Sequence, residues 1–209
     1  MLRPPAPDPF PHLVVDGLWS EWIVEAVAGE FPQAWHPGWR RYDGEHERKL
    51  EGSDPTMWGT ATQGMIARLL DPEWCDELGE AFGITGLVGD TIGGGYHSIS
   101  CGGRLDVHTD FSVHPTSGLY RRLNCLVYLN RSWRPEHGGA LELHDADGLA
   151  VTVEPFGGRT AIFATSATSW HGHPVPWAGP SPRKSVAAYY FAPEPPPGFA
   201  GPHSTVWRS

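Results

Sequence analysis

The second half of the chain alternates between apolar and polar residues with a period of two, and this pattern limits the fold more than any other feature. From residue 90 onward, short runs rich in Val, Ile, Leu, Thr and Tyr are separated by Gly, Pro and Asp. Such runs are typical of strands, because successive side chains of a strand point to opposite faces. Strands that follow one another without intervening helices form a barrel or a double-sheet jelly roll. The predicted strands are residues 91–99, 104–110, 121–130, 139–145, 149–154, 159–165, 168–173 and 184–192.

The first half of the chain predicts helices that support this β core. Residues 16–30, 60–70 and 71–82 each show apolar side chains at helical spacing, and Asp16 and Asp71 are the expected N-caps of the first and third helix. We therefore predict a mainly β fold with flanking α-helices, in which a jelly-roll core of about eight strands is buttressed by N-terminal helices.

Residues 31–59 are rich in Trp, Gly and Pro and show no clear period, which predicts a long irregular excursion. Such an excursion could form a lid over an active site, with Trp39 and Trp58 as candidate substrate contacts, although Trp residues are also good core residues. The predicted organisation is a flexible N-terminus at 1–11, one domain at 12–192 with buttress and lid at 12–89 and β core at 90–192, and a Pro-rich C-terminal tail at 193–209 that leaves the fold.

Composition narrows the classes of partner and compartment. The chain has 209 residues with 40% hydrophobic content, enough for one well-buried core, and its net charge is −9 with no basic run. We therefore expect no nucleic-acid partner. Three scattered cysteines predict a reducing compartment, and the lack of any long apolar run predicts no membrane segment. We expect a cytoplasmic protein, and the oligomeric state is left open.

Two imidazole regions and one carboxylate form the most informative polar pattern. His108 and Asp110 lie two positions apart on a predicted strand, so they share one face about 6.5 Å apart. A His-x-Asp pair is on its own more often a surface pair than a ligand pair. A second region on a later strand carries His171 and His173 on one face, and either could complete the two-His, one-carboxylate set of a non-haem Fe(II) site. Arg183 opens the next strand, and its guanidinium suits a carboxylate, although it could equally be a surface charge.

Five blocks of sequence together resemble the prolyl-4-hydroxylase-like branch of the Fe(II)/2-oxoglutarate-dependent dioxygenases. The resemblance covers residues 90–192 and implies a double-stranded β-helix, in agreement with the strand count. Its blocks are residues 103–111, 121–133, 138–143, 169–174 and 183–190.

The resemblance assigns roles to individual residues. It implies that His108, Asp110 and His171 bind Fe(II), because the family pattern Ser-aromatic-His-Gly places the ligand before the glycine. It also implies that Arg183 and Tyr128 hold the distal carboxylate of 2-oxoglutarate, which with O2 is the co-substrate.

Strand periodicity adds candidates that the resemblance does not supply. Arg122, Asn124 and Tyr128 fall on one face of a predicted strand, so we expect all three to point into the barrel. Asn124, together with Ser185 on a later strand, is a candidate contact of the co-substrate, and Arg122 is a candidate contact of the prime substrate. The alternative is an ordinary core Asn and an Arg at the rim.

The activity that the resemblance implies is hydroxylation of an unactivated C–H bond, with release of succinate and CO2. Asp110 favours hydroxylation over halogenation, because a halogenating relative would carry Gly or Ala at this position. The expected substrate is a small molecule, an amino acid or a peptide side chain. Two alternatives are a jelly-roll metalloenzyme that does not use 2-oxoglutarate and a non-enzymatic binding module with structural His residues.

Overall fold

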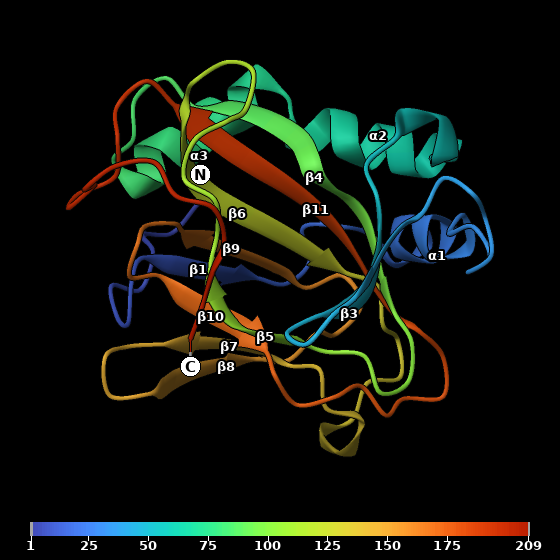
Figure 1. Ribbon diagram of the computed structural model, residues 1–209. Coiled ribbons are helices and arrows are strands. Elements are labelled where there is room, and N and C mark those ends of the chain that lie inside the picture. The colour runs from blue at the N-terminus through green and yellow to red at the C-terminus, as the bar shows by residue number, and fades with distance from the viewer. Residues whose placement is uncertain (1, 209) are drawn as a thin grey trace.

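The computed structural model describes residues 2–208, and it shows three helices and two β-sheets that lie face to face (Figure 1). The helices are α1 (Glu21–Gly29), α2 (Thr60–Leu69) and α3 (Pro72–Phe82), with short 3-10 turns at Pro55–Met57 and Pro135–His137. The strands are β1 (His12–Val15), β2 (Arg40–Asp43), β3 (Arg48–Gly52), β4 (Val88–Ile99), β5 (Leu105–Thr109), β6 (Tyr120–Tyr128), β7 (Leu141–His144), β8 (Leu149–Val153), β9 (Thr160–Ala164), β10 (Trp170–His173), β11 (Arg183–Ala192) and β12 (Val206–Trp207).

The two antiparallel sheets confirm the predicted jelly-roll core. The larger sheet has the order β1-β9-β6-β11-β4-β3-β2, and the smaller has the order β12-β5-β10-β7-β8. Each of the eight predicted strands is present, from β4 to β11. None of the helices among residues 2–208 is long and apolar enough to cross a membrane.

Strand β11 lies at the centre of the larger sheet and explains how the layers pack. Its residues alternate between two apolar clusters, because neighbouring side chains of a strand point to opposite faces. Val186, Ala188 and Tyr190 pack with the helices, whereas Ala187 and Tyr189 face the space between the sheets. The central strand is therefore buried on both faces, which accounts for its nearly continuous apolar sequence.

The helices largely follow the sequence prediction, with one difference at α1. Asp71 caps α3 by accepting a hydrogen bond from the backbone N–H of Glu73, as its position predicts. Helix α1 instead begins at Glu21, with Ser20 at the N-cap position. The carboxylate of Asp16, the predicted cap, pairs with Arg159 at 2.9 Å.

Residues 31–59 are not simply irregular, because they contain the β2–β3 hairpin. Strand β3 pairs with β4 and extends the larger sheet. The hairpin tip reaches the smaller sheet, where the Asp106 N–H donates to the carbonyl of His46 and the Arg48 N–H donates to the carbonyl of Arg104. The hairpin therefore connects the two sheets at the edge of β5.

The two tryptophans predicted as lid residues are buried in the core between the excursion and the larger sheet. Trp39 packs near Tyr96, with ring centroids 6.1 Å apart, and the indole N–H of Trp58 donates to the carbonyl of Gly52. Their sequence context could not separate a lid from a core, and the structure places them in the core.

Both ends of the chain return to the β core, contrary to the predicted loose N-terminus and departing tail. Phe10 is buried against Phe163 between the sheets. At the other end, β12 pairs with β5, and Trp207 lies opposite His108. Arg208 donates to the carbonyls of Asp145 and Ala146, which fixes the end of this strand.

Candidate active site

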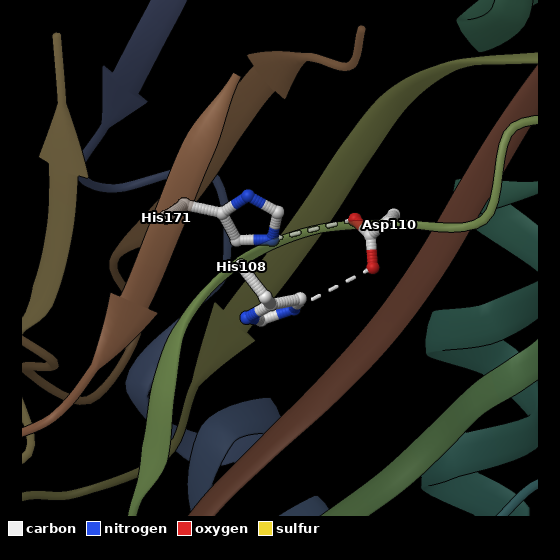
Figure 2. Close-up of side chains that lie close together, drawn as sticks. All are labelled: His108, Asp110 and His171. Atoms are coloured by element: carbon white, nitrogen blue, oxygen red, sulfur yellow. Dashed lines mark ion pairs between the residues drawn. The ribbon is translucent and has the colours of Figure 1, made fainter. Parts of the chain in front are cut away.

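Two histidines from neighbouring strands and one aspartate meet between the sheets (Figure 2). His108 on β5 lies directly opposite His171 on β10 in the antiparallel register, and Asp110 follows the end of β5. The His108 Nε2 to Asp110 Oδ1 distance is 3.7 Å, and the His171 Nε2 to Asp110 Oδ2 distance is 3.3 Å. One potential ligand atom from each side chain lies within 4.8 Å of the others.

Backbone carbonyls fix the orientation of both imidazoles. The Nδ1 of His108 lies 2.8 Å from the carbonyl of Asp106, and the Nδ1 of His171 lies 2.9 Å from the carbonyl of Ser169. A carbonyl can only accept, so each Nδ1 carries the proton and each Nε2 keeps its lone pair for a metal. Burial, with the neighbouring His171, lowers the pKa of His108, which favours the neutral ring that binds metals.

A buried arginine and an asparagine hold the aspartate. Arg121 Nη2 lies 3.2 Å from Asp110 Oδ2, and the Asn124 amide donates to the same oxygen at 2.7 Å. Burial alone would raise the pKa of Asp110, but the charge of Arg121 and the neighbouring His171 and His108 together outweigh it and hold this pKa well below its usual range. Asp110 therefore stays ionised.

A β-bulge in β6 explains why Arg121 occupies the place predicted for Arg122. The pairing with β11 shifts by one residue between Leu123 and Arg121, so two-residue periodicity is broken at Arg122. Arg122 instead donates to the carbonyl of Glu194 and does not line the cavity. The expectation that Arg122 points into the barrel is wrong, whereas Asn124 does line the cavity, with its amide bonded to Asp110 and Arg121.

Arg183 lies in the same cavity as the two histidines and is only 3% exposed. Its Nε donates to the carbonyl of Gly139, and no carboxylate among residues 2–208 pairs with it. Its guanidinium carbon lies 5.0 Å from the ring centre of Tyr128, whose buried hydroxyl has no hydrogen-bond partner among these residues. A buried guanidinium and a buried hydroxyl both require partners, so this arrangement fits the carboxylate of a bound molecule.

Four further polar side chains line this cavity. Ser185 and His173 were both candidates from the sequence, the first for the co-substrate and the second as an alternative to His171, whereas His97 and Lys49 were not assigned to the cavity. Lys49 lies on the β2–β3 hairpin, whose sequence shows no clear period. His97 falls on a predicted strand but belongs to none of the sequence motifs. Burial and Lys49 lower the pKa of His97 to about 4.

His173 lies on the same strand as His171 but does not join the group of ligand atoms. Its Nδ1 is buried and has no hydrogen-bond partner among residues 2–208. Gly172 between the two histidines passes close to β5, since a Cβ added there would lie 2.8 Å from the carbonyl oxygens of Leu105 and Asp106. The bulged pairing at this point aligns His171 with His108 and His173 with Leu105.

The side chains of His108, Asp110 and His171 fit the Fe(II) ion that the sequence predicts. Two neutral imidazoles and one carboxylate form the facial triad of non-haem Fe(II) oxygenases, which leaves three metal positions open. The guanidinium of Arg183 lines the same cavity, with the ring of Tyr128 beside it, and it suits the distal carboxylate of a dicarboxylate such as 2-oxoglutarate.

The comparisons with known proteins agree with this geometry. A family profile described as the 2OG-Fe(II) oxygenase superfamily matches residues 94–191. Comparison with functionally curated proteins gives no significant sequence match.

Three solved structures illustrate the similarity in fold. A prolyl-4-hydroxylase from Pseudomonas putida has a TM-score of 0.66 and 17% identity, over 87% of this chain and 92% of that one. A Trichoplax adhaerens prolyl hydroxylase in complex with a peptide fragment has a TM-score of 0.57 and 16% identity, over 86% and 83%. HygX from Streptomyces hygroscopicus, with nickel, 2-oxoglutarate and hygromycin B bound, has a TM-score of 0.57 and 16% identity, over 87% and 82%.

The match falls on the strands that carry the triad, and it extends from β4 to β11. The fold, the geometry and the family profile thus lead to one conclusion. The chain belongs to the 2OG-Fe(II) oxygenase superfamily, with Fe(II) bound by His108, Asp110 and His171 and with 2-oxoglutarate as co-substrate.

Proposed function

We propose that the protein uses O2 to hydroxylate an unactivated C–H bond of a small molecule, an amino acid or a peptide side chain, with one oxygen atom entering the product and the other entering succinate as 2-oxoglutarate loses CO2. The single observation that carries this proposal is the buried Arg183, which lacks a carboxylate partner among residues 2–208 and shares a cavity with the triad. A metalloenzyme that did not use a carboxylate co-substrate would have no use for this unpaired charge.

The protein residues have separate tasks in the proposed reaction. When bound, Fe(II) and 2-oxoglutarate supply the oxidising chemistry. Arg183 offers a planar pair of donors to the distal carboxylate, and Tyr128 and Ser185 add hydroxyl groups beside it. The apolar side chains Phe163 and Leu126 line the cavity and limit access of water. Asp110 keeps the triad complete, which supports hydroxylation over halogenation.

The net charge of the chain and the molecules bound in its structural neighbours support the proposed substrate class. The negative net charge argues against a nucleic-acid substrate. One structural neighbour contains a peptide fragment and another contains hygromycin B, so this fold accommodates both a peptide and a small molecule. We therefore propose a substrate from one of these two classes.

Anaerobic titration tests the proposed use of 2-oxoglutarate. Addition of Fe(II) and then 2-oxoglutarate to the purified protein should produce a weak visible charge-transfer band, and exposure to O2 should yield succinate even without substrate. If neither the band nor succinate forms, the protein does not use 2-oxoglutarate. Arg183→Leu is the matched control, because it removes the guanidinium without touching the three ligands.

A substrate screen then tests the hydroxylation. Panels of amino acids, short peptides and small metabolites are incubated with Fe(II), 2-oxoglutarate and O2, and products are followed by mass spectrometry. The expected result is one compound that gains the mass of one oxygen atom in step with succinate formation. A product that gains chlorine or loses hydrogen without gaining oxygen would assign a different reaction.

A further inference from the structure

Arg121 is a buried cation that lies close to two aromatic rings. It is 3% exposed, and its guanidinium carbon lies 3.6 Å from the ring centre of Tyr189 and 4.6 Å from that of Phe111. Contact of the guanidinium with these rings leaves the nitrogen atoms at its edge free to form hydrogen bonds. The direction in which Arg121 donates is therefore set by packing.

The polar edge of Arg121 forms a closed network with two neighbours. Its Nε donates to Asn124 Oδ1 at 2.9 Å, and its Nη2 lies 3.2 Å from Asp110 Oδ2. The Asn124 Nδ2 completes the network by donating to the same Asp110 oxygen at 2.7 Å. Both interactions with the aspartate thus converge on Oδ2.

This convergence distinguishes the two oxygen atoms of Asp110. A carboxylate oxygen has about two acceptor sites, and those of Oδ2 are occupied by Arg121 and Asn124. Although His171 Nε2 lies 3.3 Å from Oδ2, a metal there would compete with both donors. Oδ1, 3.7 Å from His108 Nε2, receives neither bond.

We propose that Arg121 is a positioning residue that, together with Asn124, restricts Asp110 to binding the metal through Oδ1 alone. A facial triad leaves three positions open. A 2-oxo acid can chelate a metal through its adjacent carboxylate and keto oxygens, which occupies two of them. If Asp110 bound through both oxygens, it would take a position that the co-substrate or O2 needs.

The backbone of β6 supports this role, because the bulge at Arg122 is what turns Arg121 to the same face as Asn124. Bulges interrupt a ladder of hydrogen bonds and re-aim side chains, and they are common beside active sites. Arg122 provides a matched control at the adjacent position, since it is the same residue type but bonds to the carbonyl of Glu194.

The test compares Arg121→Gln with Arg122→Gln in the Co(II)-loaded protein, whose visible spectrum reports coordination number. We expect Arg121→Gln to bind one Co(II) per chain with an altered spectrum. Its Kd for 2-oxoglutarate, measured from the same spectrum, should rise roughly tenfold. This is the effect of losing one hydrogen bond to the charged carboxylate of Asp110, which then competes with 2-oxoglutarate for a metal position. Arg122→Gln should match the wild type in both measurements. Because the inference rests on the proposed use of 2-oxoglutarate, the wild-type titration is the reference.

The possible outcomes separate the two proposals. A wild type whose Co(II) spectrum does not respond to 2-oxoglutarate contradicts the proposed function. A wild type that responds, beside an Arg121→Gln variant with an unchanged spectrum and Kd, overturns the positioning role. If Arg121→Gln does not fold, Asn124→Ala replaces it, because this change removes the other bond to Oδ2 and retains the guanidinium. The same spectral change, with a smaller rise in Kd, is then expected, and wild-type behaviour would again overturn the proposal.

Discussion

Arg183 is buried in the cavity, yet it bonds only to one backbone carbonyl among the described residues. Substitution by Lys keeps the positive charge and removes the planar pair of donors. We expect Arg183→Lys to raise the KM for 2-oxoglutarate by roughly ten- to a hundred-fold, the effect of losing hydrogen bonds to a charged group. Steady-state succinate assays measure this change, and iron stoichiometry serves as the control. An unchanged KM would show that another group holds the carboxylate.

His171 and His173 allow a sharp comparison within one strand. His171 lies opposite His108 and points its Nε2 at Asp110, whereas His173 lies opposite Leu105. We expect His171→Ala to lose iron and all turnover of 2-oxoglutarate, and His173→Ala to retain iron with partial activity. Iron analysis and succinate formation of both variants check this prediction, and the opposite ranking would transfer the third ligand to His173.

The sequence predicted the three metal ligands better than the residues around them. Individual residues show why. His108 and Asp110 share a strand face by simple periodicity, and this prediction holds. Arg122 was predicted by the same rule, but a single bulged residue exchanged it for Arg121. A bulge adds one residue to a strand without leaving a distinct composition, so periodicity alone could not reveal it.

At the scale of elements, the end of α1 is joined to the start of α2 by polar contacts of one side chain. Glu30 accepts hydrogen bonds from the backbone N–H groups of Ala61 and Thr62 and from the Thr62 hydroxyl, all at the start of α2. It thereby satisfies donors that α2 cannot satisfy itself. The N-cap residue of α2 is Gly59, which has no side chain for this purpose.

Glu30→Gln should therefore destabilise the protein in a pH-dependent manner. Burial alone would raise the pKa of Glu30, but the bonds from Thr62 and Ala61 outweigh it and lower the pKa below its ordinary 4.5. The stabilisation by the carboxylate is thus complete above pH 4.5 and is lost as the pH falls through the lowered pKa. At pH 7 we expect a loss of about 1 kcal/mol, or roughly 2–4 °C in Tm. The control is Glu80→Gln at an exposed position. A Tm difference that persists unchanged at acid pH would contradict this assignment.

Elements with a regular pattern were predicted, and those without one were not. The strands from β4 to β11 could be predicted because they are short runs rich in Val, Ile, Leu, Thr and Tyr, separated by Gly, Pro and Asp. The β2–β3 hairpin carries charged residues on both faces, with four of its nine strand residues exposed. The two residues of β12 are too few to show any period. Both elements form because they pair with strands elsewhere in the sequence, and the local pattern of residues does not reveal such pairing.

At the scale of the whole molecule, the reactivity of the three cysteine thiols measures how well the packed layers exclude solvent. Cys75 and Cys125 are buried and Cys101 is exposed, and all three are free. Burial raises the pKa of Cys125 to about 12, so its thiol stays protonated. We expect a thiol reagent to modify Cys101 rapidly in the native protein and all three cysteines after denaturation. Fast modification of Cys125 in the native state would show that the core opens readily.

The pairing of β12 with β5 has a consequence for the biosynthesis of the enzyme. The strand that carries His108 receives one neighbour from β10 and the other from β12, near the end of the chain. Until these segments are translated, β5 therefore lacks both of its neighbours in the smaller sheet, and the chain holds His108 and Asp110 without their partner His171. Iron can enter a complete triad only after these late segments have emerged, so metal loading follows translation of the β core.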